Sequence, residues 1–117
     1  MDERRKATRK KVLAFTPVSQ PETGLVLGYL GDLTLQGALV IGEKTLELGR
    51  QMTLGIEFPN PLPGVDENQL TLHAQVTHCV RESNSTDYLI GFEFLQTTAE
   101  QVNIIALLLE RYNYRYQ

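Results

Sequence analysis

The sequence predicts a mainly β domain, an antiparallel barrel or sandwich of six strands, with one helix after the last strand. Three observations support this fold class. Between residues 12 and 94, short runs rich in β-branched and aromatic residues alternate with turn residues. Apolar and polar residues alternate most clearly over residues 69–81, as a half-buried strand requires. After residue 96, the apolar residues recur at the spacing of a helix.

The six expected strands follow one another at the short intervals of a small antiparallel sheet protein. Turn-forming residues separate them at residues 20–22, 42–44 and 82–85, and the prolines within residues 60–64 mark a further loop. A chain of 117 residues has room for one domain, and we expect residues 12–117 to form it. The predicted strands are Val12–Val18, Leu25–Asp32, Gly37–Ile41, Gln51–Phe58, Gln69–Arg81 and Tyr88–Phe94.

The last two strands are expected to form a hairpin, because a polar turn joins two runs of matching alternation. With this alternation, His78 lies on the apolar face and His73 on the opposite face. The residues expected to face the core are Leu70, Leu72, Ala74, Val76 and Val80 on the first strand and Tyr88, Ile90, Phe92 and Phe94 on the second.

A helix is predicted from about residue 98 to about residue 112. Thr97, followed three residues later by Glu100, has the pattern of a capping box. The apolar residues then form a surface wider than one stripe, which either packs in a deep groove of the same domain or contacts another subunit. We favour the first alternative. The stripe is Val102, Ile105, Ala106 and Leu109, and the residues that widen it are Ile104, Leu107 and Leu108.

The formal net charge of -3 hides an uneven distribution. Residues 1–11 hold six of the eleven basic residues against two acidic ones, which gives +4. The other 106 residues hold five basic and twelve acidic residues, which gives -7. We interpret residues 1–11 as a flexible basic arm that binds an anionic partner, since a general nucleic-acid binder more often has a basic face throughout.

Targeting signals are missing from the sequence. No run of eighteen apolar residues is present, and the N-terminus is charged rather than apolar. We therefore expect no signal peptide, no membrane insertion and a cytoplasmic location. The one cysteine, Cys79, has no partner for an internal disulfide, which agrees with a reducing compartment.

The sequence offers few groups for catalysis or metal binding. His73 and His78 are expected on opposite faces of one strand, and His73 and Cys79 share a face but lie about 20 Å apart. Neither pair forms a metal site, and packing explains Cys79 better than a nucleophilic role does. We expect no catalytic residue, no metal, no cofactor and no enzyme activity.

Two polar motifs together supply what an anionic guanine nucleotide needs. Arg5 and Arg9 in the arm can bind phosphates and the O6 and N7 atoms of guanine. The carboxylate of Asp32 can accept hydrogen bonds from the ring N–H and the amine of guanine. Thr34 follows on the same side, and Gly37 lets the chain turn or a ligand approach closely. An ordinary turn explains the second motif alone, but its combination with the arginines is specific.

These residues resemble the motifs of PilZ domains, which are receptors for the bacterial second messenger cyclic di-GMP. The RxxxR motif of that family is matched by Arg5 and Arg9, preceded by the additional Arg4 that is often seen. Its second motif, (D/N)xSxxG, is matched from Asp32 to Gly37, with threonine in place of the usual serine. The segment Tyr88–Phe94, followed by a helix, is also similar to the end of a PilZ barrel.

The resemblance covers nearly the whole chain and implies a six-stranded antiparallel β-barrel with a C-terminal α-helix. It implies a sensor or adaptor that binds one or two molecules of cyclic di-GMP, reorders its arm and signals to a downstream protein. The residues implied to bind the ligand are Arg5, Arg9, Asp32, Thr34 and Gly37, with secondary contributions from Arg4, Lys6, Lys10 and Arg81.

Two other interpretations stay open at this point. A PilZ-like module that binds only proteins is favoured by Thr34 and by the wide apolar surface of the helix. A small nucleic-acid-binding barrel is disfavoured, because the body is acidic and has no row of stacking aromatic residues on a basic face. We therefore expect no DNA or RNA partner, and the sequence is compatible with a monomer or a homodimer.

Overall fold

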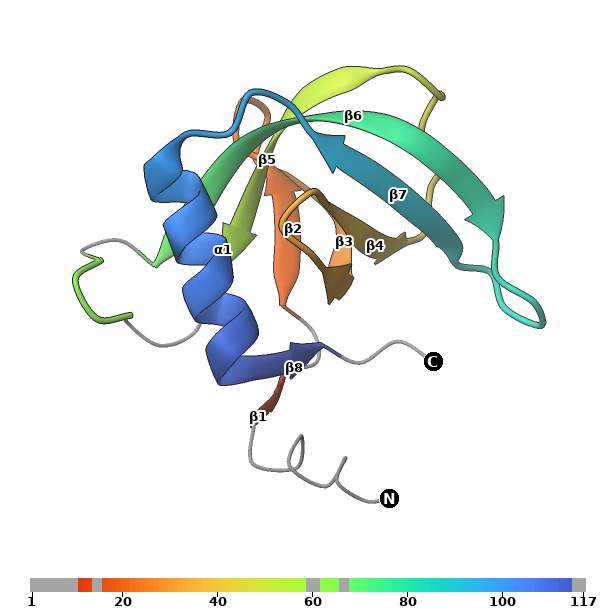
Figure 1. Ribbon diagram of the computed structural model, residues 1–117. Helices are drawn as coiled ribbons and strands as arrows, with labels where there is room; N and C mark the ends of the chain where they lie inside the picture. Colours follow the sequence, from red (N-terminus) through yellow and green to blue (C-terminus); the bar gives the residue numbers. More distant parts are fainter. Residues whose placement is uncertain (1–10, 14–15, 59–61, 66–67, 115–117) are drawn as a thin grey trace.

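The computed structural model describes residues 11–13, 16–58, 62–65 and 68–114. Six strands form a closed barrel in the order β2-β3-β4-β7-β6-β5, and every neighbouring pair in it is antiparallel (Figure 1). This architecture confirms the six-stranded antiparallel barrel that the sequence predicts. In chain order the elements are β1 (Lys11–Leu13), β2 (Pro17–Gln20), β3 (Leu25–Leu33), β4 (Gly37–Gly42), β5 (Gln51–Glu57), β6 (Gln69–Arg81), β7 (Tyr88–Phe94), α1 (Ala99–Arg111) and β8 (Tyr112–Tyr114).

The interior of the barrel is filled by apolar side chains from all six strands. Residues on each strand alternate between this interior and the outer surface, and closure of the barrel leaves no unpaired edge to be covered. Among the side chains with at most 2% exposure are Val18, Leu30, Val40, Leu54, Leu72 and Ile90, one from each strand. The predicted inward residues of the last strand, Ile90, Phe92 and Phe94, are buried as expected.

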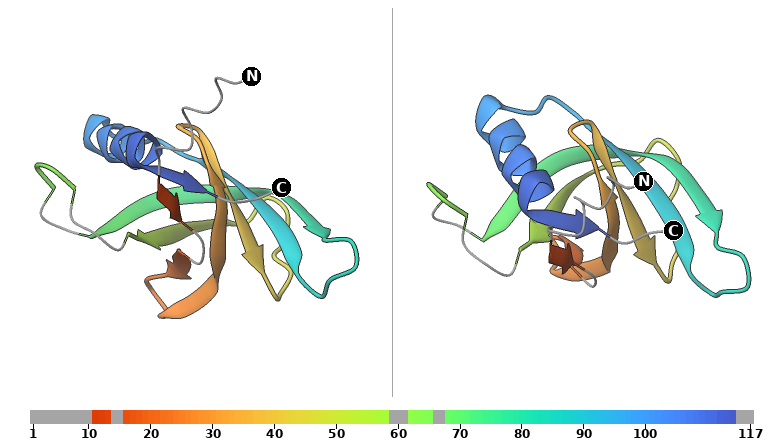
Figure 2. Two further views of the ribbon diagram at one scale, coloured as in Figure 1. Left: turned by 90° about the horizontal axis from the view of Figure 1, so that it is seen from below. Right: turned by 60° about the horizontal axis from the view of Figure 1, so that its bottom comes forward.

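The single strand predicted over Val12–Val18 is wrong, because the structure has two strands there. β1 lies outside the barrel and pairs in parallel with β8, whereas β2 belongs to the barrel and pairs with β3 and β5 (Figure 2). The partner of β1 follows the helix, almost one hundred residues later in the chain. A local alternation pattern holds no information about such a distant partner, so the division of the strand could not be predicted from it.

The predicted alternation on β6 fails after Val76, because a β-bulge interrupts the pairing with β7. Val76 pairs with Phe92 and His78 with the next residue, Gly91, so Thr77 is the extra residue. After the bulge the two faces exchange: Cys79 packs against the core, whereas Val80 is 45% exposed. The predictions that Val80 and His78 face the core are therefore wrong. The prediction that His73 lies on the opposite face from His78 and on the same face as Cys79 is also wrong, because both histidines are exposed.

The helix α1 confirms the predicted helix to within one residue at each end, but its cap lies one position later than predicted. The side chain of Thr98, not Thr97, accepts a hydrogen bond from the Gln101 N–H at 3.1 Å. The Gln101 side chain in turn accepts from the Thr98 N–H at 2.8 Å. Glutamine satisfies a capping box as well as glutamate does, so Glu100 is left as an acidic residue of the first turn.

The wide apolar surface of α1 packs against the barrel, at the end where β6 begins (Figure 1). Ile105 and Leu108 are fully buried, and Leu107 and Leu109 are half-buried against the core. The Gln101 side chain also donates to the Thr71 carbonyl of β6 at 2.8 Å. Packing within the chain thus accounts for the apolar surface. No helix within the described part of the chain is long and apolar enough to cross a membrane.

Replacement of the cap residue should weaken the helix. We expect Thr98→Ala to lower the free energy of unfolding by about 1 kcal/mol, because the Gln101 N–H loses its acceptor. Thr97→Ala is the matched control and should change it by less than about 0.5 kcal/mol. Urea unfolding of both variants measures the difference. A larger loss for Thr97→Ala would contradict the observed cap.

A second prediction concerns the contact between α1 and the barrel. Ile105→Ala should lower the free energy of unfolding by about 2–5 kcal/mol, because the fully buried side chain leaves a cavity. Leu48→Ala is the control, since Leu48 is 65% exposed in the β4–β5 loop, and its effect should stay within about 0.5 kcal/mol. If Ile105→Ala and Leu48→Ala lowered the stability equally in thermal unfolding, the packing of α1 against the core would not contribute to stability.

Candidate functional site

The predicted residues Asp32, Thr34 and Gly37 lie together around the turn between β3 and β4. Thr34 organises this turn through both its main chain and its side chain. Its N–H donates to the Gly37 carbonyl at 2.9 Å, and its hydroxyl oxygen accepts from the N–H groups of Gln36 and Gly37 at 3.2 and 3.1 Å. Such bonds from a short polar side chain hold a turn in one shape. The threonine hydroxyl is therefore a structural group of the turn.

Asp32 is an exposed residue near the end of β3, where a bulge between Leu30 and Asp32 interrupts the pairing with β4. One carboxylate oxygen, Oδ1, accepts a hydrogen bond from the Leu33 N–H at 2.9 Å. This bond orients the carboxylate without burying it. An oriented, exposed carboxylate can accept two hydrogen bonds from a ligand that carries adjacent N–H donors.

Gly37 is required by the packing of β4 against β7. A Cβ atom at this position would collide with the main-chain carbonyl oxygen of Phe92. Backbone atoms leave no space for adjustment there, so any other residue would displace one of the strands. The glycine of the predicted motif thus has a structural reason that is independent of any ligand.

A shallow hollow of about 410 Å³ surrounds this turn on the outer surface of the barrel. Besides the three predicted residues, it includes Glu93 of β7 and Thr77 of β6. Glu93 pairs with Gly37, and the Thr77 hydroxyl donates to the Gly91 carbonyl at 3.3 Å. Neither residue is predicted from the sequence motifs. Thr77 depends on the bulge in β6, and Glu93 depends on the register between β4 and β7, neither of which shows in a local pattern.

The charge of the hollow is negative. Asp32 and Glu93 are exposed carboxylates, and no lysine or arginine is among the described residues that line the hollow. A ligand with N–H donors finds acceptors there, but an anionic ligand needs cations from elsewhere. Also within the described ranges, no three His, Cys, Asp or Glu residues come together as a metal site requires.

The arm residues of the first predicted motif lie outside the described residues. These are Arg4, Arg5, Lys6, Arg9 and Lys10. The structure does describe where the arm joins the domain, because Lys11 begins β1 and pairs with Tyr112 of β8. β8 in turn lies next to β3, the strand that carries Asp32.

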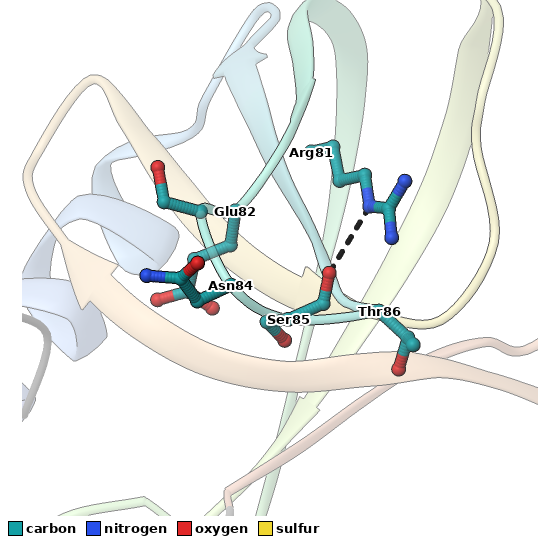
Figure 3. A pocket seen from close by; sticks show the side chains of 6 residues that line it. Arg81, Glu82, Asn84, Ser85 and Thr86 are labelled. Atoms are coloured by element: carbon teal, nitrogen blue, oxygen red, sulfur yellow. Dashed lines mark hydrogen bonds between the residues drawn. The ribbon is translucent and has the colours of Figure 1, made fainter.

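Arg81 is not brought together with the other predicted site residues. Its Nε donates to the Ser85 carbonyl at 3.0 Å, so the side chain closes over the β6–β7 hairpin (Figure 3). Across the sheet, Asp32 is level with Leu39, Gly91 and His78, one on each successive strand. Arg81 lies three residues beyond His78 on β6, about 10 Å along the strand.

A wider hollow of about 990 Å³ lies at the far end of the barrel from the β3–β4 turn. Leu25, Leu27 and Ile90 contribute apolar surface to it. Its charged residues have both signs: Lys44 and Arg50 are basic, and Glu43, Glu82 and Asp87 are acidic. None of the predicted site residues falls on this hollow. The Asp32 turn is therefore the place where the sequence motif and a hollow of the structure coincide.

Comparison with known protein families gives one result that covers the chain. The family model of the PilZ domain matches residues 3–111, a range that includes residues 3–11 of the basic arm, all six barrel strands and α1. No match was found among curated proteins or among solved structures. The order of the motifs, the closed six-stranded barrel and the C-terminal helix agree with this match. The chain belongs to the PilZ domain family.

Proposed function

We propose that this protein is a non-enzymatic sensor that binds cyclic di-GMP and passes the signal to a partner protein. The PilZ family is a family of cyclic di-GMP receptors and adaptors. The single observation that supports the proposal most strongly is the position of Asp32, an exposed and oriented carboxylate beside a rigid turn. That residue stands where the second motif of the family places its guanine acceptor.

The hollow suits the base of the nucleotide better than its phosphates. Guanine presents a ring N–H and an amine side by side, and a carboxylate accepts both. Leu33 N–H holds one oxygen of Asp32 in place, which reduces the ordering needed when the base binds. The hollow is open to solvent on the outer face of the barrel, so a planar base can reach it without rearrangement of the strands.

The phosphates need the arm. Because the described lining of the hollow is acidic, the two negative charges of cyclic di-GMP must be met by groups outside it. Arg5 and Arg9 carry guanidinium groups that bind phosphate or the O6 and N7 edge of guanine in pairs of hydrogen bonds. Arg4, Lys6 and Lys10 add positive charge nearby in the sequence. Asp32 and the arm therefore bind different parts of the ligand, a guanine base and the phosphates.

Binding of the base by Asp32 and of the phosphates by the arm suggests how the signal is passed on. Ligand binding orders the arm, and charge-assisted hydrogen bonds offset the conformational entropy that the arm loses. The ordered arm and ligand present a new surface beside β3 and β4. A partner protein with higher affinity for that surface converts nucleotide binding into an output, because it shifts the population toward the ordered state.

A module that binds only proteins is the second candidate. Glu93 favours it, because this exposed carboxylate lies in the same hollow as Asp32 and repels an anionic ligand. Thr34 does not favour it, since its hydroxyl already serves the turn as a serine hydroxyl would. Selective nucleotide binding decides between the two candidates.

The central prediction is selective binding of cyclic di-GMP that depends on the arm. Isothermal titration should show saturable binding to the wild-type protein and none to GTP or cyclic di-AMP. Arg5→Ala combined with Arg9→Ala should weaken binding at least a hundredfold, because each lost charged hydrogen bond costs about 1.5–3 kcal/mol. The melting temperature of the ligand-free variant should match the wild type. Undiminished binding by the folded double variant would contradict the proposal.

Thr34 gives a second test, since two variants separate its hydroxyl from its methyl group. Thr34→Val removes the acceptor for the Gln36 and Gly37 N–H groups, so we expect a loss of stability of about 1–2 kcal/mol and weaker nucleotide binding. Thr34→Ser keeps the acceptor and should change stability by less than about 0.5 kcal/mol. Urea unfolding and titration measure both effects. A Thr34→Val protein of unchanged stability would show that the hydroxyl does not hold the turn.

A further inference from the structure

Two carboxylates in the hollow around the β3–β4 turn have no charged partner in the described part of the chain. Asp32 and Glu93 are both exposed, and no ion pair joins either of them to a described lysine or arginine. The Leu33 N–H holds one oxygen of Asp32, and the other described residues that line the hollow are uncharged. The hollow therefore carries two negative charges that its own lining does not neutralise.

The two carboxylates lie two strands apart on the outer face of the barrel. Asp32 of β3 pairs with Leu39 of β4, which in turn pairs with Gly91 of β7. Glu93 lies two residues further along β7 and pairs with Gly37 of β4. At about 4.8 Å between strands and about 3.3 Å per residue, the Cα atoms of Asp32 and Glu93 are about 12 Å apart. Between them, β4 has no side chain at Gly37.

The spacing of the two motif arginines in the basic arm matches this separation. In an extended backbone alternate residues share a face, so Arg5, Ala7 and Arg9 point to the same side. Positions four residues apart, at about 3.3 Å per residue, place the Cα atoms of Arg5 and Arg9 about 13 Å apart. Ala7, midway between them, has the smallest side chain of the arm, so the backbone can pass close over Gly37.

The arm also joins the domain on the side from which it can reach both carboxylates. Lys11 pairs with Tyr112 of β8, and β8 lies next to β3. The arm thus starts about 10 Å from β3, a distance that two extended residues and the side chain of Arg9 can span. Outward along the arm, Arg9 comes before Arg5, and across the sheet β3 comes before β7. The arginines and the carboxylates therefore follow in the same order.

We infer that the basic arm docks on this hollow in the absence of nucleotide, with Arg9 on Asp32 and Arg5 on Glu93. Residues 1–11 carry a formal charge of +4, opposite in sign to the hollow. The tether beside β3 gives the arm an effective concentration on the order of millimolar at the hollow. A second copy of the chain offers the same arm only at its bulk concentration, so the arm of the same chain is the favoured occupant.

Docking gives Glu93 a function that nucleotide binding alone does not provide. Beside an anionic ligand this carboxylate is unfavourable, whereas beside Arg5 its charge is neutralised. Exposed ion pairs are individually weak, so a ligand that binds the hollow more tightly can displace the arm. The carboxylate thus holds the arm at the hollow without locking it there.

A consequence for regulation rests on the proposed function. The docked arm occupies Asp32, the acceptor proposed for guanine, so the nucleotide has to displace Arg9 from it. The displaced arginine is then free to bind a phosphate, and the entropy that the arm loses is divided between docking and nucleotide binding. Docking itself is measured without nucleotide, so its failure is distinguishable from failure of nucleotide binding.

The test follows the Ala7 N–H by NMR relaxation in the isotope-labelled full chain, at low salt and without nucleotide. We expect an order parameter above about 0.6 in the wild type, since flexible segments give lower values. Asp32→Asn combined with Glu93→Gln should lower it below about 0.6. The matched control, Glu22→Gln with Glu47→Gln, removes two exposed carboxylates outside the hollow and should leave it unchanged. Melting temperatures verify that the variants fold.

A charge swap tests the contact between Arg5 and Glu93 directly. Arg5→Glu alone and Glu93→Arg alone should each lower the order at Ala7, because each brings like charges together. The two changes combined should restore it. Four outcomes would overturn the inference: a flexible Ala7 in the wild type, release of the arm by the control, no restoration by the swap, or loss of order on dilution. The last would place the arm on a second copy of the chain.

Discussion

The pairing of β4 with β7 is the constraint on which the rest of the structure depends. These strands are separated in sequence by β5 and β6, and their contact joins the β2–β3–β4 part of the barrel to the β7–β6–β5 part. Gly37 makes this contact possible, because any side chain there would collide with the Phe92 carbonyl. A slip of one residue would turn Leu39 and Ile41 into the interior and Val40 onto the surface. The register between β4 and β7 is thus defined both by the packing of the core and by Gly37.

The same register organises the outer surface. It places Glu93 beside Gly37, which completes the hollow around the β3–β4 turn. Asp32 of β3 and Glu93 of β7 thus reach one hollow from two strands that β4 holds together.

Patterns among neighbouring residues predicted those elements of the fold that depend on neighbouring residues alone. Alternation located β6 and β7 from Gln69 to Phe94, helical spacing located α1, and the motif located the Asp32 turn. The failures share one physical cause, a dependence on distant partners. Val12–Val18 divides because β1 pairs with β8 after the helix, and Val80 turns outward because of a bulge opposite Gly91. Glu93 enters the hollow only through pairing with β4. The arm residues lie outside the described residues, so their roles stay predictions.

The most direct measurement is an NMR titration of the isotope-labelled full chain with cyclic di-GMP, followed through its backbone N–H signals. We expect saturable shifts at Asp32, at the Gln36 and Gly37 N–H groups of the turn and at Glu93, together with shifts in the arm. The signal of Leu48 in the β4–β5 loop should not move, because that loop lies at the other end of the barrel. Absence of saturable shifts at the Asp32 turn would contradict the assignment of this surface as a nucleotide site.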